Sequence, residues 1–308
     1  MTLSLPSASE LAQWSLTCQR PSPWVSTSDR LTNLTDEHAF DLQLATDKGI
    51  AAQRAEHFDL GIAPDRWLNR WVKVHDDLNA MLSIRFKGMD VTQPFVDVSV
   101  TTRPLTSNDF AALREVASRE YGPFQALRLR FWSPADMNEF PEVAPDLRAL
   151  AAPLSELRNQ PVPEGLTLSP TPDDRHYVQA QAAYGVVDAQ HPAHGAQASL
   201  ISREDLQDGI EAGTMFDVMW NGDWSGYAGT LPGTNHGFLT QTVQELVLAP
   251  HARGQGLGPF LSVLLAHHLP DDGSVLYGTI HGENTGARQA ALTAGRVDFG
   301  GWNWLPMG

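Results

Sequence analysis

One stretch of the sequence decides the fold that we expect, and it reads Glu245-Leu-Val-Leu-Ala-Pro-His-Ala-Arg-Gly-Gln-Gly-Leu-Gly258. An apolar strand runs into Pro250, which lacks an amide hydrogen and ends strand pairing, so we expect a gap beside this strand. Gly254, Gly256 and Gly258 lack a Cβ, which allows several backbone amides to point into one small volume. The turn precedes a predicted helix, whose N-terminus favours negative charge. The segment predicts a phosphate-binding turn, and the alternative is a glycine-rich surface loop.

The spacing of this turn excludes two common nucleotide-binding motifs. It lacks the G-x-G-x-x-G pattern of dinucleotide-binding folds, and no Lys-Ser or Lys-Thr follows as in a P-loop. The segment resembles the signature of the GNAT acetyltransferase superfamily, in which a strand and V-x-P precede [QR]-x-x-G-x-[GA]. Arg253, Gly256 and Gly258 occupy the three specified positions of the turn, and Leu248 stands in place of the Val.

A second element of this resemblance follows the predicted strand 275–280. Asn284, Ala287 and Gly295 match the family pattern in register. Ala291 stands where many members have a Tyr that acts as general acid, and Arg296 replaces a usual Phe. The resemblance covers residues 163–308, whereas Arg103–Asp109 repeats only the strand and helix cap and has no glycine turn.

The resemblance implies acetyl-CoA as co-substrate and no metal. The main chain of one strand segment would pair with the pantetheine arm, the backbone amides of the turn would hold the pyrophosphate, and one side chain would bond the pantetheine or the adjacent backbone. The strand segment is Leu246, Val247 and Leu248, and the single side chain is that of Asn284. The turn comprises Arg253, Gly254, Gln255, Gly256, Leu257 and Gly258.

The catalytic base that the resemblance implies is Glu245, which precedes Pro250 by five residues. On strand alternation it faces opposite to Leu246 and Leu248, toward either an acceptor cleft or solvent. Tyr277 could replace the missing general acid, although a tyrosine in mid-strand more often belongs to the core. His281 could be an acid or base, or a surface histidine.

The remaining sequence predicts an α/β (α+β) fold with a mixed, mostly antiparallel sheet flanked by helices. From residue 166 onward we expect the order βααβββαβαβ, with strands and helices in these ranges: 166–170, 172–187, a short helix from 202, 215–220, 224–231, 238–248, 256–268, 275–280, 285–293 and 297–304. In the N-terminal half we expect helices over 34–45, 63–78 and 108–120, and strands over 80–86, 95–101 and 124–132.

Two domains are expected, 1–157 and 163–308, because the polar stretch Arg158–Gly165 carries two prolines and is typical of a linker. Strand, helix and strand recur at an offset of 149 residues, from Pro94 and from Val243. This spacing suggests two GNAT-like domains in tandem, of which the N-terminal one is degenerate or merely accessory.

The charge of the chain limits its partners. The formal net charge is −15, which argues against nucleic acid and against an anionic membrane surface. Residues 160–308 contain 15 Asp and Glu against five Arg and no Lys, so a cationic acceptor would be attracted. Cys18 is the single cysteine, and no secretion signal or spanning segment is evident, which favours the cytoplasm. His191, His194 and Asp188 lie in a loop that we expect to be solvated rather than metal-binding.

Together these features predict an N-acyltransferase that transfers an acetyl or other acyl group from acetyl-CoA to the amine of a small molecule or protein. The acceptor is expected to be cationic. The alternative is a non-catalytic acyl-CoA sensor, which the missing tyrosine favours.

Overall fold

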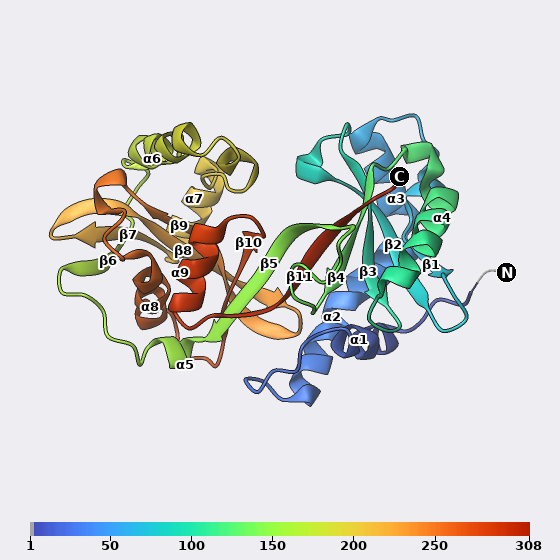
Figure 1. Cartoon of the computed structure of the whole chain (residues 1–308), viewed down its shortest axis with the longest axis horizontal. Coiled ribbons are helices and arrows are strands. Elements are labelled where there is room, and N and C mark those ends of the chain that lie inside the picture. The colour runs from blue at the N-terminus through green and yellow to red at the C-terminus, as the bar shows by residue number, and fades with distance from the viewer. Residues whose placement is uncertain (1–2) are drawn as a thin grey trace. The chain divides into compact units, whose positions relative to one another are not determined.

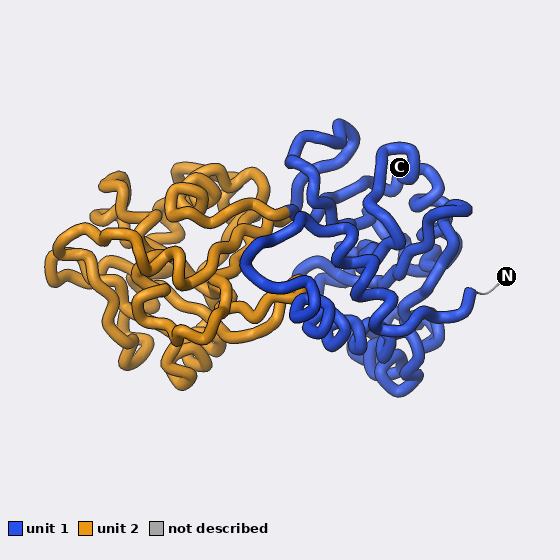
Figure 2. The backbone as a smooth tube through the Cα atoms, turned by 90° about the horizontal axis from the view of Figure 1, so that it is seen from below, with its two compact units in different colours: residues 1–146, 300–308 blue, residues 147–299 orange. Residues whose placement is uncertain are grey.

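The computed structural model describes residues 3–308, which form two compact units (Figure 2). Unit 1 contains the described residues up to Asp146 together with Gly300–Gly308, and unit 2 contains Leu147–Phe299. This division differs from the predicted one, because the boundary lies before residue 147 and the C-terminal strand belongs to unit 1. The expected linker is part of unit 2: the guanidinium of Arg158 donates to the carbonyls of Ala266 at 2.5 Å and Leu269 at 2.6 Å.

Unit 1 contains a five-stranded mixed sheet in the order β1-β2-β3-β4-β11. Only β3 and β4 are parallel neighbours in it. Its elements are α1 (Ala8–Thr17), α2 (Thr27–Thr46), α3 (Lys48–Phe58), β1 (Arg70–Lys73), β2 (Asn79–Phe86), β3 (Pro94–Thr101), α4 (Phe110–Tyr121), β4 (Arg128–Ser133) and β11 (Val297–Pro306), whose first residues lie in unit 2 (Figure 1).

The sequence prediction for unit 1 was correct for the central strands, for α4 and for the helix over 34–45, which lies within α2. It missed α1 and α3, and it was wrong for residues 63–78. The helix expected over 63–78 is a short 3-10 turn, Pro64–Trp67, followed by β1. Trp67 is buried in an aromatic cluster beneath the sheet, stacked on Phe58 at 5.5 Å between ring centroids. Tertiary packing of these rings overrides the helical spacing of the apolar residues.

Unit 2 contains a six-stranded sheet in the order β5-β10-β9-β8-β7-β6. All neighbouring strands in it are antiparallel except β9 and β10. Its elements are β5 (Ala144–Pro153), α5 (Leu154–Leu157), β6 (Leu166–Pro170), α6 (Tyr177–Gln190), α7 (Arg203–Glu211), β7 (Met215–Trp220), β8 (Asp223–Asn235), β9 (Phe238–Leu248), α8 (Gly258–His268), β10 (Val275–His281) and α9 (Thr285–Thr293) (Figure 1).

The predicted order βααβββαβαβ from residue 166 onward is confirmed, as is the mixed, mostly antiparallel sheet with helices. Two details differ. The sequence prediction missed β5, and α6 begins at Tyr177 rather than at Pro172. Thr171 does not cap that helix; its hydroxyl donates to Asp217 on β7 at 3.3 Å.

Alternation along β9 sends side chains to the two faces of the unit 2 sheet. Val247 packs against α6 and α7, in a cluster with Ala183 and Leu206. Leu246 and Leu248 pack on the opposite face, in the cluster that contains α8. No helix in residues 3–308 is long and apolar enough to span a membrane.

Candidate active site

The central feature of unit 2 is the point where two parallel strands separate. β9 and β10 pair at only three positions, and the last pair is Tyr277 opposite Thr242. Beyond it, Val243–Leu248 and Gly278–His281 line opposite sides of a cavity of about 1260 Å³. The edge of β9 that faces β10 is therefore unpaired along this stretch, while its other edge remains paired with β8.

A β-bulge accompanies the separation. Gly229 of β8 lies opposite Glu245, and the next residue, Thr230, lies opposite Val243, so Gln244 is the extra residue on β9. A bulge bends a strand and increases its local twist, so the bulge bends β9 away from β10. The sequence prediction placed the cause of the gap at Pro250, but the strands separate well before that residue. Pro250 instead begins the short 3-10 turn Pro250–Ala252, which leads into the glycine turn.

The glycine turn connects β9 to α8 and has the conformation that its glycines allow. Gly254 and Gly256 have φ angles of +72° and +73°, in the left-handed region that favours glycine. No described residue accepts a hydrogen bond from the backbone amides of residues 254–258, and α8 has no side-chain cap. Unsatisfied amides at the first turn of a helix carry partial positive charge and bind anions.

Arg253 lines the cavity beside this turn, whereas Gln255 does not. The Arg253 Nη1 donates to the carbonyl of Ala183 on α6 at 3.1 Å, and burial lowers the pKa of its guanidinium. The Gln255 side chain is exposed and donates to the carbonyl of His251 at 2.6 Å. Of the turn residues expected at the pyrophosphate, Gly254, Gly256, Leu257 and Gly258 also line the cavity.

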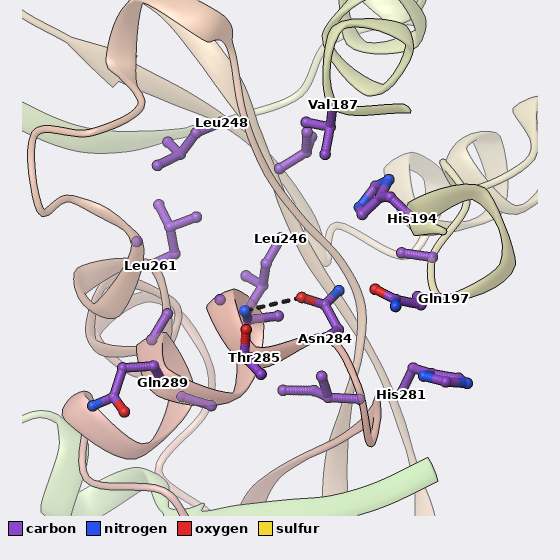
Figure 3. A pocket seen from close by; sticks show the side chains of 18 of the residues that line it. Val187, His194, Gln197, Leu246, Leu248, Leu261, His281, Asn284, Thr285 and Gln289 are labelled. Atoms are coloured by element: carbon purple, nitrogen blue, oxygen red, sulfur yellow. Dashed lines mark hydrogen bonds between the residues drawn. The ribbon is translucent and has the colours of Figure 1, made fainter. Parts of the chain in front are cut away.

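Asn284 lies at the N-terminus of α9 and lines the same cavity (Figure 3). Its Oδ1 accepts a hydrogen bond from the amide of Ala287 at 3.1 Å, which caps the helix. Its Nδ2 donates to no described residue, so both hydrogens of this NH2 group remain for a ligand. Leu246, Val247 and Leu248 line the same cavity as Asn284.

Glu245 is buried, with only 4% of its surface exposed, and lines the cavity on the α6 and α7 face. The Tyr184 hydroxyl donates to its Oε1 at 2.9 Å, and the Ile201 amide donates to its Oε2 at 3.1 Å. Burial raises the pKa of the carboxyl to about 7, although these hydrogen bonds and that of the Leu246 amide act in the opposite direction. The group is thus poised to exchange a proton near neutral pH.

Tyr184 is a cavity residue that sequence reasoning missed. Burial, followed by the charge of Glu245, raises the pKa of its hydroxyl, which stays protonated and acts as a donor. His194 lies beside it, with ring centroids 5.7 Å apart, and its Nδ1 is 2.7 Å from Asp188 Oδ1. No local pattern links Tyr184 to Glu245, which is 61 positions away, so the pairing could not be read from the chain.

The sequence predicted a solvated loop around His194, but in the structure this loop forms part of the cavity wall. Val187, His194 and Gln197 lie on one side of the cavity, and Leu261 and Gln289 lie on the other (Figure 3). Within residues 3–308, no group of three His, Cys, Asp or Glu side chains is arranged to hold a metal ion.

Three other predicted residues have distinct environments. Ala291 is buried on α9 and lines the cavity, but it offers no hydroxyl. Tyr277 is buried against Phe299, with centroids 6.0 Å apart, and does not line the cavity, which agrees with the core interpretation. His281 lines the cavity, and its Nδ1 accepts a hydrogen bond from the Glu283 amide at 3.2 Å.

Comparison with known proteins gave matches among solved structures. Solved GNAT acetyltransferases are similar to this chain. An acetyltransferase of this family from Colwellia psychrerythraea is 13% identical, with a TM-score of 0.47 over 83% of this chain and 95% of the other. A GCN5-related N-acetyltransferase from Sphaerobacter thermophilus is 14% identical, with a TM-score of 0.46 over 87% and 93%.

A tandem GNAT protein from the clavulanic acid biosynthesis pathway is 12% identical, with a TM-score of 0.46 over 86% of this chain and 97% of that chain. Some of the similar structures are of proteins with unknown function. No protein-family model matches the chain, and no curated protein sequence matches it significantly. At these identities the similarity concerns the fold alone.

Proposed function

We propose that unit 2 is an N-acyltransferase that transfers an acyl group from an acyl-CoA thioester to an amine. One observation carries the proposal: the separated strands β9 and β10 form a cavity with free backbone amides at one end and a buried carboxyl on the opposite face. The amides suit a phosphate ligand, and the carboxyl suits proton transfer. An acyl-CoA and an amine acceptor need these two chemistries within one site.

The donor would lie along the unpaired edge of β9. Its pantetheine arm contains two amides, which can pair with the main chain of residues 246–248 in the manner of an added strand. Its pyrophosphate would accept hydrogen bonds from the amides of residues 254–258, with the Arg253 guanidinium nearby. The free Nδ2 of Asn284 would bind a pantetheine carbonyl.

In the reaction the neutral amine nitrogen attacks the thioester carbonyl carbon. A carbon–nitrogen bond forms and the carbon–sulfur bond breaks. The amine proton passes to the Glu245 carboxylate, directly or through a water molecule, and CoA leaves as a thiolate that water protonates. A free amide of the β9 edge would stabilise the oxyanion. A base with a pKa of about 7 is matched to this task at neutral pH.

The acceptor would enter from the α6 and α7 face, where Glu245 and Tyr184 lie. The net formal charge of −10 over residues 160–308 favours a cationic amine, from a small molecule or a protein.

Ala291 favours a second candidate function, an acyl-CoA sensor without turnover, because this cavity residue offers no proton donor to the leaving thiolate. Glu245→Gln separates the two functions. We expect the variant to bind acetyl-CoA with unchanged affinity and to lose at least about 100-fold in kcat. Unchanged amide formation by the variant would exclude Glu245 as the base, and an inactive wild type that binds acyl-CoA would favour the sensor.

The first test of donor binding is calorimetric titration with CoA and acetyl-CoA. We expect one site per chain, and a loss of at least about 100-fold in affinity when a carboxylate is placed among the amides in an Arg253→Glu, Gly256→Asp double variant. Because Gly256 has a positive φ, Arg253→Glu alone serves as an unstrained companion. Arg175→Glu is the matched control, since Arg175 is outside the cavity and pairs with Asp173. Absence of saturable binding by the wild type would contradict the proposal.

A further inference from the structure

Arg296 follows α9 and is the most deeply buried cation of the cavity wall, with 2% of its surface exposed. Its Nη2 donates to the carbonyls of Leu150 at 2.8 Å and Gly278 at 3.3 Å, and its Nε donates to Leu150 at 3.3 Å. Its Nη1 donates to no described residue. One face of the guanidinium therefore retains unused donors.

Among the residues that the structure describes, no carboxylate neutralises this side chain. Within residues 3–308 Arg296 forms no ion pair, whereas the neighbouring Arg148 and Arg288 both pair with Asp298, at 2.7 Å and 3.4 Å. Burial lowers the pKa of the Arg296 guanidinium to about 10, opposed by Tyr277, so it remains a cation at neutral pH. A buried charge without a counter-ion is costly, which is the condition that an anionic ligand relieves.

The guanidinium lies at the closed end of the gap between β9 and β10. Gly278 is the first residue of β10 beyond the paired segment, and a Cβ at this position would lie 2.5 Å from Arg296 Nη2. The same Cβ would lie 3.2 Å from the side chain of Val243, the first unpaired residue of β9. Gly278 thus allows the guanidinium to occupy the place of its missing side chain.

Arg296 and Glu245 lie on opposite faces of the sheet. Val243, near Arg296, packs in the cluster that contains α8, while Glu245 is bonded to Tyr184 of α6 and to Ile201. The glycine turn leads into α8, so the cation is on the side of the donor and the carboxyl is on the side of the acceptor. An anion bound by Arg296 is therefore expected to arrive with the acyl group.

We propose that the acyl group transferred by this protein ends in a carboxylate, which Arg296 binds at the closed end of the gap. This inference rests on the proposed acyltransferase function. The donor would be the CoA thioester of a short dicarboxylic acid, such as succinyl-CoA. Residues 243–246 span at most roughly 10 Å, the length of a regular strand without the bulge at Gln244, and a chain of a few carbons and the arginine head bridge this distance together.

Transfer of such a group follows the same bond changes as acetyl transfer. The carbon–sulfur bond breaks and the carbon–nitrogen bond forms at the thioester carbonyl, while the distal carboxylate stays paired with Arg296 and leaves on the product amide. No further reactant is needed. The product would carry a negative charge where a cationic amine was, which reverses the charge of the acceptor.

The test compares succinyl-CoA with butyryl-CoA, which has a similar length and no distal charge. We expect the purified wild type to bind succinyl-CoA about 10- to 100-fold more tightly, the range of one charge-assisted hydrogen-bonded pair. Equal affinities, or a preference for the uncharged thioester, would overturn the proposal. Binding of CoA itself is measured in parallel, because its absence would contradict the proposed function rather than this inference.

Two variants locate the preference. Arg296→Met removes the cation, and Gly278→Ala keeps it but displaces its head; we expect either to reduce the succinyl preference to within about threefold while CoA affinity is retained. Arg175→Met is the exposed control and should leave the preference unchanged. If Arg296→Met does not fold, Gly278→Ala and the wild-type comparison still decide. If both variants still prefer succinyl-CoA over butyryl-CoA, the carboxylate binds at another site and the proposal is wrong. The same holds if the wild type prefers a carboxylate on the acceptor and not on the acyl group.

Discussion

The two units use the same order of strand, helix and strand with different results. In unit 1, β3 and β4 are parallel and joined through α4; in unit 2, β9 and β10 are parallel and joined through α8. Both pairings start at the first residue of the second strand, Arg128 or Val275, but β3 and β4 remain paired at a fourth position, Val98 opposite Phe131. In unit 2 the residues that would follow, Val243 and Gly278, no longer pair.

The residue at that fourth position of the second strand differs between the units. Phe131 is buried and packs against Phe110 of α4 and against Phe140, with centroids 5.3 Å and 5.9 Å away. These rings fill the space beside the strands of unit 1. Gly278 has no side chain, so the corresponding space in unit 2 is left to Arg296 and the cavity.

The two units also differ at the N-terminus of the connecting helix, α4 or α8. In unit 1 the Asp109 carboxylate accepts hydrogen bonds from the Thr106 amide at 2.7 Å and from Arg103 at 2.9 Å. The protein thus supplies its own anion before α4. In unit 2 the amides of residues 254–258 have no such partner among the described residues, which leaves the N-terminus of α8 available to an external anion.

The largest effect that we expect from this comparison comes from Phe131→Ala. Removing a buried aromatic ring should lower the free energy of unfolding of unit 1 by about 3–5 kcal/mol, because a cavity replaces the ring. The acyl-CoA affinity of unit 2 should not change. Denaturant unfolding and calorimetry measure the two quantities. Leu127→Ala, at an exposed position of unit 1, is the control with little effect. A gain of CoA binding sites in Phe131→Ala would indicate that unit 1 retains a latent site.

A smaller loss of stability is expected from Asp109→Ala. It removes the anion before α4 and should cost about 1–2 kcal/mol at pH 7, the range of a helix cap. Although burial opposes it, the bonds from Arg103 and Thr106 hold the pKa of Asp109 below its usual value. Its contribution is therefore present above pH 4 and is lost as pH falls through the lowered pKa. Denaturant unfolding at pH 7 and pH 3 measures the difference in free energy of unfolding between the variant and the wild type. An equal difference at the two pH values would contradict this account.

The smallest effect concerns protonation. Burial raises the pKa of Glu245 to about 7, whereas the bonds from Arg103 and Thr106 lower the pKa of Asp109, so Glu245 should titrate at a clearly higher pH than Asp109. Carbon-13 NMR of the carboxyl groups, assigned with Glu245→Gln, measures both. If Glu245 is the base, kcat/KM should rise about fivefold between pH 6 and pH 7, as the ionised fraction grows. A Glu245 resonance that titrates near pH 4.5 would refute the poised carboxyl.

The donor half of the candidate site could be predicted from the sequence much better than the acceptor half. Pro250, Gly254 and Gly256 lie within a few residues of one another, and their local chemistry predicts a turn before a helix, which the structure contains. Tyr184 and Ile201 reach Glu245 across the fold, and no local rule predicts such contacts. The expected linker failed for the same reason, since Arg158 is held by carbonyls at the end of α8.

By itself the sequence determined the alternation of strands and helices from residue 166 onward, the glycine turn and the acidic character of the C-terminal half, because each depends on neighbouring residues or on composition. The tertiary structure alone decided where β9 and β10 separate, which carboxyl is buried and which arginine lacks a counter-ion. Burial and charge pairing depend on residues brought together from distant parts of the chain. Glu245 and Arg296 acquire their unusual states only when α6 and β10 pack beside them.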